Sequence, residues 1–132
     1  MKQLTSYNRV AGYLNKLFDL LNGHYFENAL TRPTITIQST PRAYGHFSTR
    51  DDTWVSVTGN SNEINIGAGT LSRPIENVCA TLLHEMCHYY CHVNGIKDTS
   101  RGNTYHNKRF KEIAESHGLI VGHDEKYGWT LT

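Results

Sequence analysis

Apolar residues near the start of the chain recur three or four positions apart. This spacing predicts a helix over residues 7–22, with Thr5 or Ser6 as its cap and Gly23 as its end. A helix with one apolar face packs that face against the rest of the protein. The residues of the expected apolar face are Val10, Tyr13, Leu14, Leu17, Leu20 and Leu21.

The middle of the chain alternates apolar and polar residues with a period of two. Such alternation is typical of strands with one buried face, and it covers residues 34–39, 44–48, 54–58 and 63–67. A polar turn cluster, 59–62, precedes the last of these segments. We therefore predict a small, mostly antiparallel sheet of three or four strands.

A helix that is apolar over much of its circumference follows the predicted strands. It begins near Pro74, a residue suited to the first helical position, and ends at Gly95. We expect it to be buried, because its apolar residues are Ile75, Val78, Leu82, Leu83, Met86 and Tyr90. A polar connection over 96–105 without regular structure then leads to a further helix over 106–117, which Gly118 ends.

The order of these elements predicts an α+β fold that forms one domain of 132 residues. An N-terminal helix precedes the small sheet, and the buried helix and the further helix follow it. Residues 119–121 and 129–131 are expected to form short final strands. A chain of this length can bury a hydrophobic core without disulfides.

Charge and cysteine content narrow the functional classes. The chain has 13 Lys and Arg against 12 Asp and Glu, which argues against nucleic-acid binding by overall electrostatics. Its three cysteines, Cys79, Cys87 and Cys91, form no C-x-x-C pair and predict no disulfide framework. No apolar run resembles a signal peptide or a membrane span, so we expect a soluble, cytoplasmic protein with no membrane partner.

The buried helix carries the motif His-Glu-x-x-His at residues 84–88. Two histidines four positions apart on a helix lie about 40° apart around its axis and about 6 Å along it, which suits two ligands of one zinc ion. A metal also provides a partner for polar groups on a buried helix. We therefore predict one Zn²⁺ ion held by His84 and His88, with Glu85 placed beside the metal to handle the proton of its water.

A third protein ligand must come from outside this helix, because catalytic zinc usually has three protein ligands and one open position. His92 lies about 12 Å along the axis from the first histidine, which is too far. Glu112 and Glu115 are rivals, because some zinc peptidases take a glutamate from a later helix. His106 is the better candidate, because it stands where a polar loop meets a helix that Phe110 anchors in the core.

Three segments, 84–88, 98–102 and 106–110, together resemble the SprT-like zinc metalloprotease family, and weaker similarity spans nearly the whole chain. The resemblance implies a minimal zincin-like domain in which the further helix supplies the third ligand. It assigns that ligand to His106, which opens the family's His-Gly-x-x-Phe-like pattern, although Asn107 replaces the usual glycine. Many members continue into a zinc ribbon of paired cysteines, which this sequence lacks.

The resulting functional hypothesis is a zinc-dependent peptidase that acts on a protein or peptide substrate. Zinc activates a water molecule for attack on the peptide carbonyl, and Glu85 is the general base. An extended substrate is expected to pair with the strand at 63–67. The candidates for oxyanion or substrate contacts are Tyr89, Tyr90 and Tyr105.

The resemblance also implies a role on DNA-associated proteins. A basic cluster around the third ligand could contact phosphates, although a solvated start of a helix explains it equally well. Without a zinc ribbon, we expect DNA binding to be weak and strongly dependent on salt. The residues of this cluster are Arg101, Lys108, Arg109 and Lys111.

Two other functions are compatible with the motif. A noncatalytic, zinc-stabilised binding module for protein or nucleic acid would need a fourth protein ligand, with Cys91 and His123 as candidates. It would leave the carboxylate beside the first ligand unexplained. A zinc hydrolase that acts on another kind of bond would share the same site chemistry.

Overall fold

The computed structural model describes residues 2–38, 45–47, 54–56, 59–100 and 105–131. Its helices are α1 (Lys2–Tyr25), the short 3-10 helix η1 (Ala68–Ser72), α2 (Ile75–Val93) and α3 (Lys108–Ser116). Its strands are β1 (Thr34–Gln38), β2 (Gly45–Phe47), β3 (Trp54–Ser56), β4 (Gly59–Ser61), β5 (Glu63–Gly67), β6 (Thr99–Ser100), β7 (Tyr105–His106), β8 (Gly122–Asp124) and β9 (Gly128–Leu131). The predicted α+β class is confirmed.

The central sheet has three strands in the order β1-β5-β2. Strand β1 pairs with β5 in parallel and β2 pairs with β5 antiparallel, so both edges of β5 are occupied. The prediction that an extended substrate pairs with the strand at 63–67 is therefore wrong, because no edge of β5 is free to pair. The segment predicted as a turn at 59–62 contains β4, which forms a separate two-stranded ladder with β3.

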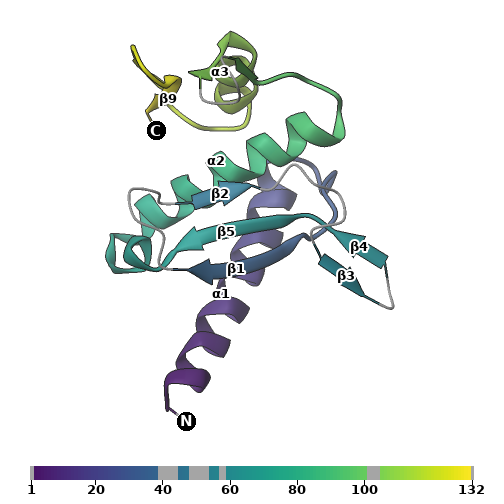
Figure 1. Cartoon of the computed structure of the whole chain (residues 1–132), viewed down its shortest axis with the longest axis vertical. Helices are drawn as coiled ribbons and strands as arrows, with labels where there is room; N and C mark the ends of the chain where they lie inside the picture. Colours follow the sequence, from purple (N-terminus) through teal and green to yellow (C-terminus); the bar gives the residue numbers. More distant parts are fainter. Residues whose placement is uncertain (1, 39–44, 48–53, 57–58, 101–104, 132) are drawn as a thin grey trace.

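The core lies between this sheet and the helices α1 and α2 (Figure 1). The parallel register places Ile35 opposite Ile64 and Ile37 opposite Ile66, so the apolar positions of the two strands meet on one face. Ile64 and Ile66 are fully buried there. Leu82 of α2 is also fully buried and belongs to the same cluster, as expected for a helix that is apolar around much of its circumference.

Helix α1 differs from the prediction in its apolar face and in its end. Phe18 is 1 % exposed, whereas Tyr13 is 47 % and Leu20 is 70 % exposed, because the core contacts only a narrow stripe of the helix. The helix also passes through Gly23 and ends at Tyr25. The chain turns afterwards, where Glu27 and Asn28 adopt positive φ angles.

Helix α2 is buried over most of its length, as predicted, although Ile75 in its first turn is exposed. It begins after Pro74, which caps the helix and does not occupy its first turn, and it ends where Gly95 takes a φ of 67°. The positive φ explains the glycine at this position. None of the helices in the described part of the chain combines the length and apolarity that a membrane crossing requires.

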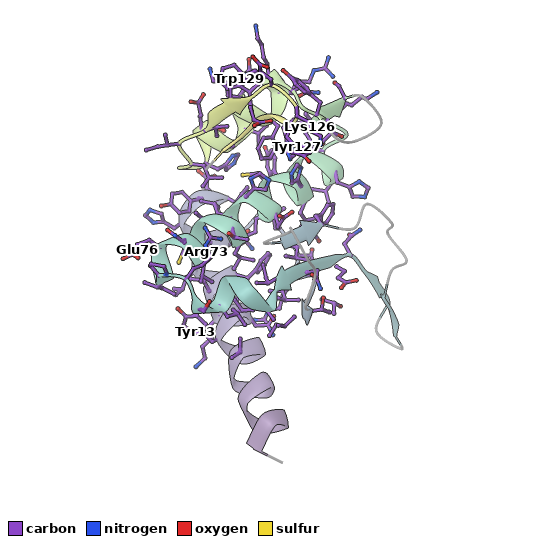
Figure 2. The ribbon with its side chains drawn as sticks, turned by 60° about the vertical axis from the view of Figure 1, so that its left-hand side comes forward. Tyr13, Arg73, Glu76, Lys126, Tyr127 and Trp129 are labelled. Carbon is purple, nitrogen blue, oxygen red and sulfur yellow. The ribbon has the colours of Figure 1, made fainter. Side chains whose placement is uncertain are left out.

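The C-terminal third packs on α2 as a small unit of its own (Figure 1). Its sheet has the order β6-β7-β9-β8, and α3 packs against β9 and α2. Figure 2 shows Lys126, Tyr127 and Trp129 at this end of the molecule, away from Tyr13 on α1. The unit therefore places residues from the end of the chain beside the helix that carries the His-Glu-x-x-His motif.

The element boundaries in this unit differ from those predicted. The connection over 96–105 contains β6, and the strand expected at 119–121 lies at Gly122–Asp124. The further helix begins at Lys108, so His106 lies on β7, before the helix that was expected to supply the third ligand. Gly118, with a φ of 93°, follows the end of α3 as predicted.

Candidate metal centre

Three histidines from two separate elements converge on one point. His84 and His88 lie one turn apart on α2, and His106 lies on β7. The Nε2 atom of His88 lies 3.2 Å from Nε2 of His84 and 3.1 Å from Nε2 of His106. Nitrogens bound to one tetrahedral zinc at about 2.0–2.1 Å are roughly 3.3 Å apart. The three histidines can therefore hold a metal ion.

The surroundings of His84 and His106 favour the neutral imidazole ring that a metal requires. Burial lowers the pKa of His84 well below its ordinary value, and the neighbouring rings of His88 and His106 lower it further. Burial and His88 also lower the pKa of His106. Because a metal binds the neutral ring, both side chains are ready to bind at neutral pH without first losing a proton.

Hydrogen bonds on the Nδ1 atoms of His88 and His106 leave their Nε2 atoms facing the centre of the three-histidine group. The Nδ1 atom of His106 lies 3.0 Å from the carbonyl oxygen of Tyr127. Since a carbonyl only accepts, Nδ1 carries the proton and Nε2 keeps a free lone pair. His88 has a carboxylate in the same place, because Oδ2 of Asp98 lies 2.6 Å from its Nδ1 atom. The donor set therefore fits a zinc ion.

The ring of Phe110 packs against the rings of all three histidines. Its side chain is fully buried, and its ring centroid lies 4.8 Å from that of His84, 4.5 Å from that of His88 and 5.0 Å from that of His106. The ring of His88 is stacked on it. This packing restricts the rotation of the histidines, so the site is preorganised by apolar contact as well as by hydrogen bonds.

Asn107, which replaces the glycine of the family pattern, fixes the junction between β7 and α3. Its side-chain oxygen accepts hydrogen bonds from the main-chain N–H groups of Arg109 and Phe110, so it caps α3. Its side-chain nitrogen donates to the carbonyl of Lys97, and its main-chain N–H donates to the carbonyl of Asp98. The residue after the third histidine thus binds the chain that leaves α2.

Gly128 allows the closest approach of the C-terminal strand to His106. The main-chain N–H of His106 donates to the carbonyl of Tyr127 at 2.7 Å, and Gly128 has a φ of 79°. A Cβ atom on Gly128 would lie 2.1 Å from the carbonyl oxygen of His106. A side chain here would therefore push β7 and β9 apart. Tyr127, Gly128 and Asp98 were not predicted from the sequence as parts of the site.

We expect Gly128→Ala to loosen the third ligand. The methyl group would displace His106 and strain the main chain, so zinc affinity should fall by at least about tenfold and the metal-free protein should lose more than about 1 kcal/mol of stability. Gly69→Ala is the matched control, because a Cβ there meets nothing within 4 Å. Chelator competition and thermal unfolding measure the two effects. Equal zinc affinity in Gly128→Ala and wild type would contradict this account.

Glu85 lies in the same turn of α2 with its side chain buried. It is 6 % exposed, and burial raises its pKa to about 7. His88 lowers this pKa and the charge of Asp98 raises it, but both effects are smaller than that of burial. A carboxyl group with a pKa near neutrality can both accept and return a proton, which is the property of a general base that later acts as an acid.

The rival third ligands, Glu112 and Glu115, are exposed on α3. Glu115 lies 3.8 Å from the ammonium group of Lys111, as a surface pair one turn apart. Among the residues that the structure describes, the side chains close enough to share one metal are His84, His88 and His106.

The two candidates for a fourth protein ligand have other partners. Cys91 is fully buried, and burial together with a hydrogen bond to Asp98 raises its pKa to about 12. The Nε2 atom of His123 lies 3.0 Å from the hydroxyl of Tyr105, and its ring packs against Trp129. Neither belongs to the three-histidine group that the described residues form.

The tyrosines predicted to contact substrate lie in three different surroundings. Tyr89 is buried with its ring 5.3 Å from that of Phe47, and Tyr90 packs 4.9 Å from His117. Tyr105 precedes His106 on β7, and neighbouring residues of a strand face opposite sides. The roles of these tyrosines remain predictions.

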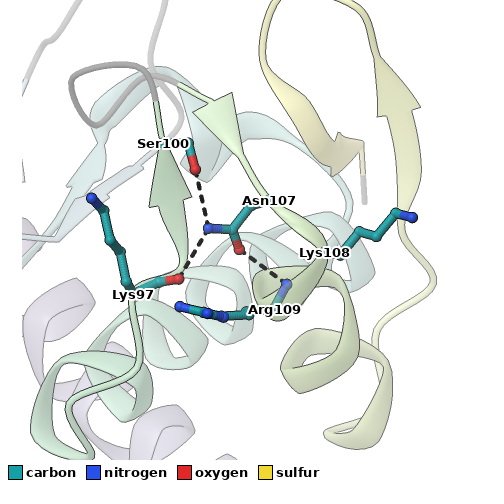
Figure 3. Close-up of a pocket in the computed structure, with 5 residues that line it drawn as sticks. All are labelled: Lys97, Ser100, Asn107, Lys108 and Arg109. Atoms are coloured by element: carbon teal, nitrogen blue, oxygen red, sulfur yellow. Dashed lines mark hydrogen bonds between the residues drawn. The ribbon is translucent and has the colours of Figure 1, made fainter.

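The predicted basic cluster is divided. Lys97, Lys108 and Arg109 line a pocket of about 420 Å³ at the start of α3, together with Ser100 and Asn107 (Figure 3). Lys111 instead lies over the ring of Trp129, 4.5 Å from its centroid. Arg101 lies outside the described residues. The pocket therefore adds Lys97 to the predicted cations and leaves Lys111 outside it.

A family model with the description SprT-like family matches residues 14–125. Neither the curated proteins nor the solved structures contain a match to this chain. The matched span includes the whole of α2, the strand that carries His106 and the loop between them. The chain belongs to the SprT-like family.

Proposed function

We propose that the protein is a zinc-dependent peptidase in which His84, His88 and His106 bind the metal and Glu85 is the general base. The observation that carries this proposal is the convergence of three Nε2 atoms, with the buried carboxyl group of Glu85 next to the first histidine on the same helix. A purely structural zinc site would require a fourth protein ligand and would give the carboxyl group no role.

The chemistry divides between the metal and the chain. A zinc ion held by three histidines supplies a Lewis acid that makes water nucleophilic at neutral pH. Glu85 accepts the proton that this water loses as it attacks the peptide carbonyl. Glu85 then returns a proton to the amine of the leaving half of the substrate. Its pKa of about 7 in the metal-free protein suits both transfers.

We propose that an extended substrate pairs with the outer edge of β2. Within the described residues this edge has no strand partner, and β2 runs beside α2 (Figure 1). The ring of Phe47 on β2 packs against Tyr89 and His92 of α2, so the strand is held against the helix that carries the site. An exposed strand edge offers main-chain hydrogen bonds to a peptide of any sequence.

Removal of the metal is expected to abolish hydrolysis. The metal-free protein should not cleave an unfolded, labelled protein substrate, and one equivalent of zinc should restore cleavage, because water at neutral pH is a poor nucleophile without the metal. His88→Ala should prevent the restoration. His24→Ala, which changes an exposed histidine near the end of α1, is the control and should behave as wild type. Cleavage that persists through chelation would exclude a metal mechanism.

We further propose a weak contact with DNA through the basic residues at the start of α3. Three of the five residues that line the pocket there are cationic and none is acidic, which favours an anionic ligand. We expect single-stranded DNA to raise the rate of cleavage of a DNA-bound substrate at low salt and to lose this effect at high salt. The double variant Lys108→Gln/Arg109→Gln should lose the effect at low salt. Identical rates with and without DNA would contradict the proposal.

A further inference from the structure

The carboxylate of Asp98 contacts a candidate metal ligand without being one. Its Oδ2 atom lies 2.6 Å from Nδ1 of His88, on the side of the ring away from the other histidines. Both side chains are shielded, with 14 % of His88 and 16 % of Asp98 exposed. We propose that Asp98 is a positioning residue that orients His88 for the metal. This inference rests on the proposed metal site.

A carboxylate on Nδ1 acts on the metal through the ring. It accepts the Nδ1 proton, which leaves the lone pair on Nε2, and its negative charge makes that nitrogen a stronger donor. It also prevents the ring from rotating about its Cβ–Cγ bond. His106 has only the neutral carbonyl of Tyr127 in this place, so the stronger orienting partner belongs to His88.

The surroundings of Asp98 hold its side chain and its main chain separately. The side-chain Oδ2 atom of Asp98 contacts the ring of His88. The main-chain carbonyl of Asp98 accepts from the N–H group of Asn107 at 3.0 Å. The side chain can therefore be changed without removing the link between the loop and the residue that follows His106.

This separation gives a direct test. Asp98→Asn keeps the shape of the side chain and removes its charge, and we expect zinc affinity to fall by about 10–100-fold, as measured by competition with a chromophoric chelator. The affinity is read without any cleavage assay. Asp19→Asn, which removes the charge of an exposed carboxylate paired with Arg32, is the control and should leave zinc affinity unchanged.

A second measurement separates orientation of the His88 ring from simple stabilisation of the protein. In the metal-free protein, the ¹⁵N shifts of the His88 ring should show the proton on Nδ1 in wild type and a mixture of tautomers in Asp98→Ala. Thermal unfolding of each metal-free variant identifies those that fail to fold.

The outcomes distinguish this inference from the proposed function. Unchanged zinc affinity in a folded Asp98→Asn protein overturns the inference, even if wild type cleaves its substrate. An unchanged tautomer in Asp98→Ala also overturns it. Weakened zinc binding in Asp98→Asn supports it, even if no variant or wild type hydrolyses peptides, in which case only the proposed function fails.

Discussion

Glu85→Gln is expected to bind zinc as wild type does and to lose peptide hydrolysis almost completely. The amide has the shape of the carboxyl group but cannot accept a proton from water, and loss of a general base costs about 10²–10⁴ in rate. Zinc should remain because the three predicted ligands, His84, His88 and His106, are unchanged. Rates from a fluorogenic peptide and metal content from the same sample measure both properties.

The same substitution should change how the stability of the metal-free protein depends on pH. Burial raises the pKa of Glu85 from its ordinary value of 4.5 to about 7. A folded pKa above the unfolded value favours folding at low pH, and this contribution is lost as the pH rises from about 4.5 to about 7. A glutamine side chain at this position does not titrate. The stability of Glu85→Gln relative to metal-free wild type should therefore increase from about pH 4.5 to about pH 7.

The matched control is Glu76→Gln, which changes an exposed glutamate in the first turn of the same helix. It should retain wild-type hydrolysis and zinc content. If Glu85→Gln hydrolysed the peptide at the wild-type rate, Glu85 would have no part in the mechanism. If it lost zinc as well as activity, the experiment would instead place Glu85 among the metal ligands.

The part of the site on α2 could be predicted because helix geometry fixes it. Two histidines four positions apart on a helix face the same side whatever the rest of the fold does. The approach of His106 to them depends on contacts that have weaker signals in the sequence. The hydrogen-bond acceptor that orients its ring is the main-chain carbonyl of Tyr127. Every residue has such a carbonyl, so the amino-acid type at this position does not indicate the contact.

Asp98 and Gly128 contribute to the site through contacts that the sequence indicates only weakly. Asp98 belongs to a segment that resembles the family, but its partner His88 can be identified only from the folded loop. A glycine near a turn has many explanations, and the close approach of Gly128 to His106 is a tertiary contact. Both residues contact partners ten or more positions away, which local patterns of spacing do not encode.

The central sheet illustrates the same limit. Alternation of isoleucines correctly predicted strands at 34–39 and 63–67 within a residue of their observed ends. It did not predict that β5 lies between β1 and β2, because period-two patterns specify the faces of a strand and not its neighbours. For this reason the prediction that a substrate pairs with β5 was wrong. We propose pairing with the outer edge of β2 because β2 lies at the edge of the sheet.

His106→Ala is expected to remove zinc from the protein while leaving it folded. Two histidines on α2 would remain, and a site with two protein ligands binds zinc far more weakly than one with three. Zinc affinity should therefore fall by more than the loss of about 10–100-fold that follows when a metal ligand loses its hydrogen-bond partner. His106 is only partly buried. Phe110 and the cap at Asn107 stay in place, which is why the fold should survive.

Zinc stoichiometry by mass spectrometry after dialysis against a weak chelator decides the assignment, with circular dichroism as the test of folding. His123→Ala is the control, since this histidine was a candidate fourth ligand and should not affect zinc content. Equal zinc content in His106→Ala and wild type would exclude His106 as the third ligand and leave Glu112 and Glu115 as the candidates. Those glutamates lie on the exposed side of α3, so either would have to bring that helix into a different position to reach the two histidines of α2.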